Sequence, residues 1–421
     1  MLNTDYVVLV FLGTIFIASL VESRTKIPYT MMLVVLGIIL SFVSLMINGL
    51  DQIKLDPKLI IDFVIPPLIF EAMMRIDYKD FVNVKISVLL LATIGVVITT
   101  LVVGFLLIYL EHLPFQIAFI FAALISPTDA AIVIKTFKIL KVPRLLSTIV
   151  EMESSFNDAT GIIIFTLIVG IVFGSSSSPI NTGSLITNNL SSINIDILHE
   201  IGHFLYLFIG GMLVGLIIAI ITNKLHTLMN NPFSEISLTI TTVFGSALVA
   251  NALGLSGLIA VATAGLYFGN VTMRKESSMS KEVRDTVSNF WDIAAFFANS
   301  VAFLYLGVTM NIIDVGQNII LILLVFASVL IGRALSTYPI LSLVNKFTKE
   351  KIPLFWQNVI MIGGMRGALS VALVTSLPQS ELKNKLEILT FGVVLFSLII
   401  QYISLTKYLK KISIKFEKMT K

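Results

Sequence analysis

The chain has 421 residues, of which 56% are hydrophobic and only 13% are charged, and its mean hydropathy is +0.96. Soluble globular domains carry about 25% charged residues, so the composition excludes an ordinary soluble protein and indicates that lipid is the solvent. The chain has no cysteine, which excludes disulfides and thiolate metal sites.

The apolar residues fall into long runs that predict membrane-spanning helices. A bilayer core requires about 20 mostly apolar residues per helix, and on that measure we predict an all-α polytopic membrane protein with about 13 spans. In chain order the predicted spans are 5–21, 28–48, 59–74, 86–110, 115–138, 147–173, 197–222, 234–252, 254–271, 288–311, 317–343, 354–377 and 387–406. The Ser- and Asn-rich stretch 174–194 is the one long linker between them.

The loops between these spans differ sharply in charge. Nearly all Lys and Arg residues lie in the loops that follow odd-numbered spans and in the C-terminal tail, whereas the other loops hold Lys54, Lys58, Lys383 and Lys385. Short cytoplasmic loops are enriched in Lys and Arg. We therefore expect a multi-pass protein of the cell membrane with its N-terminus outside and its C-terminus in the cytoplasm. The basic balance then favours anionic lipid, and not nucleic acid, as the partner.

Two predicted spans are interrupted by residues that break helices. The fifth span contains Ser126-Pro127-Thr128, and the twelfth contains Gly363-Gly364 with Gly367 close behind. The breaks lie an odd number of spans apart, so the two segments run in opposite directions through the membrane. Interrupted helices in corresponding positions of inverted repeats are typical of secondary transporters. We predict three parts: a first repeat over 1–173, a linker with the seventh helix over 174–233, and a second repeat with a basic tail over 234–421.

A small set of ionisable residues lies inside the predicted spans. Such a residue costs at least about 2.5–3.5 kcal/mol at the bilayer centre, so it marks a functional site unless it forms a structural ion pair. Both interpretations stay open for each residue taken alone. The set comprises Glu71, Asp129, Glu151, Glu153, Asp158, Asp292, Arg333 and Arg366.

Two of these carboxylates lie at similar depth, beside the first break. Asp158 is near the middle of the sixth span, and Asp129 follows the break in the fifth. Ser154 lies one helical turn from Asp158, and the proline frees backbone groups near Thr128. Hard cations prefer oxygen ligands. We predict that Asp158, Asp129, Ser154 and Thr128 bind Na⁺, and that protons compete for the same carboxylates.

The two intramembrane arginines are assigned by depth. Arg333 and Glu153 lie at similar distances from the cytoplasmic side of their spans, so we expect them to pair. Arg366 lies level with Asp158, where its charge is expected to offset the half-helix dipoles when the cation leaves. The alternative pairing of Glu153 with Arg366 stays open.

One motif indicates a different class of protein. His199-Glu200-Ile201-Gly202-His203 matches H-E-x-x-H, the signature of zinc proteases. A catalytic zinc needs a third protein ligand, and no matching acidic motif lies in a neighbouring span. An intramembrane metalloprotease is therefore the different-class alternative, and we expect the protein not to be an enzyme.

Several segments in the same order resemble the NhaP/NHE branch of the monovalent cation/proton antiporters. The resemblance rests on PPLIFEA from Pro66, ISPTDAA from Ile125, ESSFNDATGI from Glu153, GLSGLIAVATAGLYFGN from Gly254, GRALSTYP from Gly332 and GGMRGALSVAL from Gly363. It implies an NhaA-like antiporter fold with a mobile six-helix core, and a homodimer. It further implies exchange of Na⁺ or Li⁺ for H⁺.

The resemblance also implies roles for individual residues. It makes Asp158 the essential carboxylate, Asp129, Ser154 and the Thr128 backbone its co-ligands, and Glu71 a residue of the cytoplasmic access path. Asn157, which precedes Asp158, resembles the electroneutral members. No cofactor is implied beyond the transported Na⁺ and H⁺. Since ligand types do not fix cation size, a K⁺/H⁺ antiporter stays open as the second transporter interpretation.

One position departs from some relatives. Where eukaryotic members often carry an acid on the tenth helix, this chain has Asn299 and Ser300.

Overall fold

The structure is a computed structural model that describes residues 4–24, 28–46, 59–173, 197–228, 231–274, 279–310, 312–348, 351–377 and 379–419. Within these ranges the regular structure is helical and no strand occurs. This agrees with the predicted all-α membrane fold, because helices satisfy their backbone hydrogen bonds internally in lipid.

Each predicted span coincides with one to three successive helical segments. Four π-helical turns occur within the described part of the chain, and each joins directly onto an α-helix. The uninterrupted segments are α1 (Thr4–Arg24), α2 (Tyr29–Met46), η1 (Ile60–Val64) with α4 (Ile65–Arg75), α5 (Tyr78–Leu90) with η2 (Leu91–Gly95) and α6 (Val96–Glu111), α9 (Arg144–Phe173), α10 (Ile197–His226), α11 (Pro232–Ala252), α12 (Gly257–Tyr267) with η3 (Phe268–Thr272), α13 (Lys281–Thr309), α14 (Ile312–Gln317), α15 (Ile319–Phe347), and α18 (Glu381–Phe396) with η4 (Ser397–Gln401) and α19 (Tyr402–Met419).

Both predicted interruptions are confirmed. The fifth predicted span divides into α7 (Phe115–Ile125) and α8 (Ala131–Ile139), and the twelfth divides into α16 (Leu354–Ile362) and α17 (Ala368–Thr375). Proline has no backbone N–H to donate, and glycine is a poor helix former. The chain is therefore non-helical at both places and leaves backbone groups free to meet other partners.

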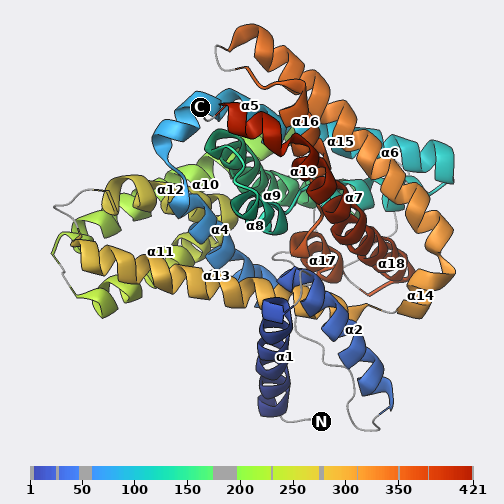
Figure 1. Cartoon of the computed structure of the whole chain (residues 1–421), viewed down its shortest axis with the longest axis horizontal. Helices are drawn as coiled ribbons and strands as arrows, with labels where there is room; N and C mark the ends of the chain where they lie inside the picture. The colour runs from blue at the N-terminus through green and yellow to red at the C-terminus, as the bar shows by residue number, and fades with distance from the viewer. Residues whose placement is uncertain are drawn as a thin grey trace.

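The helices form two groups with the interrupted segments between them (Figure 1). One end of the view contains α10, α11 and α12, the other contains α6, α14 and α15, and α8 and α9 lie in the middle. In the packing, α13 lies against α2, α10 against α12, and α15 against α6. The central place of α8 and α9 puts the first break among helices from both groups.

Length and composition give a partial test of the span count. Among the described residues, six helices are long and apolar enough to cross a membrane by themselves, and shorter apolar helices accompany them. The multi-pass character is thereby confirmed. The count of about 13 spans and the division into inverted repeats stay predictions.

Candidate functional site

A cavity of about 370 Å³ opens between the interrupted helices and their neighbours. Its wall includes Thr128, Asp129, Ser154 and Asp158, all of which were predicted to form the cation site. Asp129 and Asp158 are partly exposed toward it, whereas Thr128 and Ser154 are only 3% and 7% exposed. The four predicted ligands therefore share one cavity, with both carboxylates turned to its interior.

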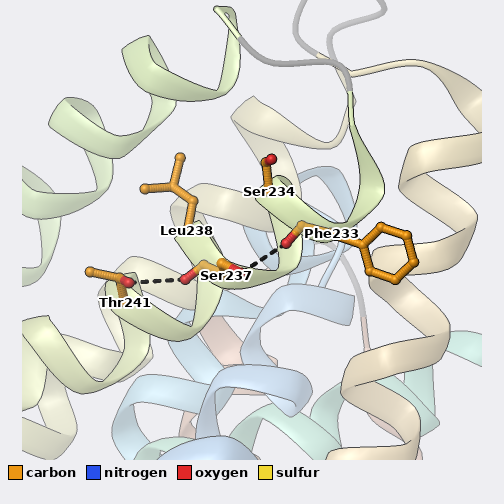
Figure 2. Close-up of a pocket in the computed structure, with 5 residues that line it drawn as sticks. All are labelled: Phe233, Ser234, Ser237, Leu238 and Thr241. Carbon is orange, nitrogen blue, oxygen red and sulfur yellow. Dashed lines mark hydrogen bonds between the residues drawn. The ribbon is translucent and has the colours of Figure 1, made fainter.

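A second hollow lies on α11 and has a different character (Figure 2). It measures about 450 Å³ and is lined by Phe233, Ser234, Ser237, Leu238 and Thr241. Ser237 Oγ donates to the Phe233 carbonyl and Thr241 Oγ1 to the Ser237 carbonyl, each over 2.9 Å. The lining has no charged group and these two hydroxyls bind their own helix, so we assign no chemistry to this surface.

The two breaks meet directly at Asp129. Its backbone N–H donates to the Met365 carbonyl over 2.7 Å, and its Oδ1 accepts from the Ala131 N–H over 2.8 Å at the start of α8. A Cβ at Gly367 would overlap the Asp129 carboxylate. The twelfth span thus needs glycine here because the acid of the fifth span occupies the space where a side chain would lie.

Asn157 and Ser154 fasten α9 to the first break. Asn157 Oδ1 accepts from the Thr128 N–H over 3.1 Å, and its Nδ2 donates to Thr128 Oγ1 and Glu153 Oε1, each over 2.8 Å. Ser154 Oγ donates to the Thr128 carbonyl over 2.6 Å and accepts from the Ala130 N–H over 3.1 Å. The non-helical stretch is therefore held by side chains of α9, next to Asp158.

Glu153 forms the buried ion pair expected from depth. Arg333 Nη1 and Nη2 donate to its two carboxylate oxygens over 2.8 and 2.7 Å, and the side chains are 1% and 4% exposed. A Cβ at Gly364 would lie 2.6 Å from Arg333 Nε. This bidentate geometry confirms the pairing with Arg333, and Glu153 is neutralised away from the cavity.

Arg366 contacts the first break instead. It is 1% exposed, and its Nη1 donates to the carbonyls of Ser126 and Pro127, the latter over 2.9 Å. These carbonyls follow the last turn of α7, where a helix end carries partial negative charge. The alternative pairing of Glu153 with Arg366 was therefore wrong, and the expected position beside a half-helix dipole is confirmed.

Glu71 lines the same cavity, and its carboxylate forms an ion pair. Its carboxylate accepts from Arg75 Nε one helical turn along α4, and Arg75 Nη2 contacts Asp292 on α13. The sequence analysis placed Arg75 among the loop cations because it directly follows the third predicted span, 59–74.

A lining residue that the sequence did not single out is Ser370. It is 1% exposed, and its Oγ has no hydrogen-bond partner among the described residues. Asn299 lines the cavity as well.

The H-E-x-x-H motif lies at the start of α10. The side chains of His199, Glu200 and His203 are outside the described part of the structure. The metalloprotease alternative therefore rests on the motif alone.

The arrangement provides oxygen ligands on the wall of a cavity inside a largely apolar helix bundle. Two carboxylates, a serine hydroxyl and a backbone carbonyl beside a helix break suit a hard monovalent cation. Each carboxylate can instead hold a proton, and a cation that binds there displaces it.

Comparisons with known proteins give a family match over nearly the whole chain. The family described as "Sodium/hydrogen exchanger, transmembrane" matches residues 7–411. The chain is 35% identical to the Na(+)/H(+) antiporter ApNhaP of Aphanothece halophytica, over 96% of this chain and 73% of the relative. It is 32% identical to the Na(+)/H(+) antiporter NhaH of Halobacillus dabanensis, over 92% of both chains.

A solved structure shares the fold. The sodium proton antiporter MjNhaP1 of Methanocaldococcus jannaschii superposes with a TM-score of 0.75 at 21% identity, over 97% of this chain and 99% of the other. The NhaA-like antiporter architecture expected from the sequence is thereby confirmed for the fold.

Proposed function

This chain belongs to the sodium/hydrogen exchanger family, and on that premise we propose that it exchanges Na⁺ for protons at Asp158 and Asp129. The family is one of transporters and not of enzymes. The proposal is carried by one observation, that both carboxylates face a single cavity beside the broken helix, together with Ser154 and Thr128.

The exchange follows from competition at that site. A carboxylate ligand must be deprotonated to bind a cation, so Na⁺ binding and proton binding oppose each other. Asp158 supplies the principal charge, and Asp129, Ser154 and the Thr128 carbonyl supply further oxygens. The Ser154 hydroxyl rotates from its bond with Thr128 to present a lone pair to the ion. The pair of carboxylates crosses either with one Na⁺ bound or with one proton bound, and it carries the same net charge in both forms.

The cycle is electroneutral in this proposal, with one proton exchanged for each Na⁺. Glu153 is held by Arg333 in a bidentate pair, and Asn157 has an amide that cannot carry a proton. Both groups next to Asp158 on α9 therefore stay out of the proton count. An electrogenic cycle would gain about 2.3 kcal/mol per net charge at 100 mV.

The cavity opens to the cytoplasm in this proposal. Arg75 and Lys138 line the cavity, and basic residues favour the cytoplasmic face. The protein is a homodimer in the cell membrane, in contact with anionic lipid. Its N-terminus lies outside. Helices of the interrupted core then carry the site past the scaffold to reach the other side.

Purified protein in proteoliposomes tests the proposal. An imposed pH gradient should collapse when Na⁺ is added, as read by a fluorescent pH probe, and Asp158→Asn should remove this response while the protein stays folded. Retention of wild-type exchange in Asp158→Asn would remove that residue from the mechanism. Substituting Li⁺ or K⁺ in the same assay gives the cation preference, and a response to K⁺ alone would establish the second transporter interpretation.

A valinomycin-imposed K⁺ diffusion potential tests the stoichiometry. The steady-state Na⁺ gradient of the wild type should not change with the potential. A gradient that follows the potential would refute electroneutral exchange.

A further inference from the structure

The wall of the cavity carries charged residues from separate helices. Glu71 and Arg75 come from α4, Asp292 from α13, Glu151 from α9 and Lys138 from α8, and all five line the cavity that leads to the site. The inference drawn from them rests on the proposed function.

Arg75 lies between two of the acids. Its Nε contacts Glu71 Oε1 and its Nη2 contacts Asp292 Oδ1, so one guanidinium occupies both carboxylates. The side chains of Arg75 and Asp292 are 36% and 42% exposed, and that of Glu71 is 18% exposed. The cluster is therefore open to water and to ions, unlike the pair of Glu153 with Arg333 deeper in the protein.

The described lining is acidic overall. Its acids are Glu71, Asp129, Glu151, Asp158 and Asp292, and its bases are Arg75 and Lys138. A cleft lined by one sign of charge raises the local concentration of counter-ions. Arg75 reduces that attraction and holds two of the carboxylates that a diffusing cation would meet first.

We propose that Arg75 is an affinity-setting residue, a tethered cation that competes with entering Na⁺ for Glu71 and Asp292. It does not bind the transported ion. It acts on the acids of the access path and sets the apparent KM for Na⁺ above the value that the acidic lining alone would give.

A structural role for the same contacts makes different predictions. Arg75 also joins α4 to α13, so its ion pair with Asp292 could serve only to hold these two helices together. Exposed ion pairs contribute little net stability, which argues against that role. Moreover, a brace is lost equally when either partner is neutralised, whereas competition requires opposite effects from neutralising the cation and the anion.

The test measures initial rates of Na⁺-dependent exchange in proteoliposomes as a function of Na⁺ concentration. Arg75→Gln should lower the KM for Na⁺ by about threefold to tenfold, as expected for removal of one nearby charge at intermediate dielectric. Asp292→Asn should raise the KM. Arg75→Lys should keep the wild-type KM, and the maximal rates should change little in all three.

Two controls test whether the change in the KM is local to the cavity and electrostatic in origin. Arg274 pairs with Asp77, is 42% exposed and does not line the cavity, so Arg274→Gln should leave the KM unchanged. Raising the ionic strength with an impermeant salt should reduce the difference between Arg75→Gln and the wild type, because salt screens exposed charges.

Changes of the KM in the same direction for Arg75→Gln and Asp292→Asn would overturn the proposal. So would a loss of maximal rate with the KM unchanged. If Arg75→Gln does not fold, Asp292→Asn still decides, because an unchanged or lower KM refutes competition. Failure of the proposed function is distinct, since the wild type would then show no Na⁺-dependent exchange or Asp158→Asn would retain it.

Discussion

The buried pair between Glu153 and Arg333 offers a quantitative test of how the core is held together. Both carboxylate oxygens accept from the guanidinium, and the side chains are 1% and 4% exposed. Removing one member of such a pair leaves an uncompensated buried charge and destabilises a protein by roughly 3–5 kcal/mol. We expect Glu153→Ala and Arg333→Ala each to lose that much free energy of unfolding.

The double variant separates this pair from its surroundings. Glu153→Ala combined with Arg333→Ala leaves no stranded charge, so its loss should be smaller than the sum of the two single losses. Chemical unfolding of purified protein in detergent, followed by fluorescence, gives the three free energies. The exposed pair of Lys135 with Glu22 is the matched control, where each single change should cost less than about 1 kcal/mol.

Additive losses would refute the pairing as a source of stability. A Glu153→Ala variant as stable as the wild type would show that Arg333 is satisfied elsewhere. A large change in the KM for Na⁺ with unchanged stability would assign Glu153 to the ion site instead.

Further predictions concern the breaks and the topology. Gly367→Ala should sharply reduce exchange because its Cβ displaces Asp129; an unchanged rate in proteoliposomes would show that the contact is unimportant. Asn157→Asp should lower the melting temperature, since it loses two hydrogen bonds donated by Nδ2, at about 1–3 kcal/mol for a buried acceptor left unsatisfied; wild-type melting would contradict this. Single cysteines at Lys346 and Gln379 should react with a membrane-impermeant reagent from the cytoplasmic and the outer side, respectively; labelling of both from the same side would contradict the predicted spans, and the reverse assignment would overturn the predicted orientation.

The interrupted helices could be predicted from the sequence because the signal is local. Proline at 127 and the glycines at 363, 364 and 367 disfavour helix whatever surrounds them. The position of Asp158 in the sixth span follows from residue counting alone. The break and the residue count together placed the four predicted ligands at the same depth, and the structure has all four on one cavity.

The partners of the charged residues were harder to predict because they depend on which sides of the helices pack against each other. The depth of the residues in their spans favoured Arg333 as the partner of Glu153 but left a pairing of Glu153 with Arg366 open. Only the packing of the helices showed that Arg366 binds the carbonyls of Ser126 and Pro127. Arg75 was missed because a cation at a helix end looks like any loop cation. The spacing of Arg75 four residues after Glu71 was the available signal.

Competition between Na⁺ and protons at Asp158 is the central claim, and proton release measures it directly. Na⁺ is added to purified protein in weakly buffered detergent solution, at a pH where the site is protonated. The account predicts release of about one proton per chain on cation binding, and none from Asp158→Asn. Saturable Na⁺ binding by the wild type without proton release would contradict it.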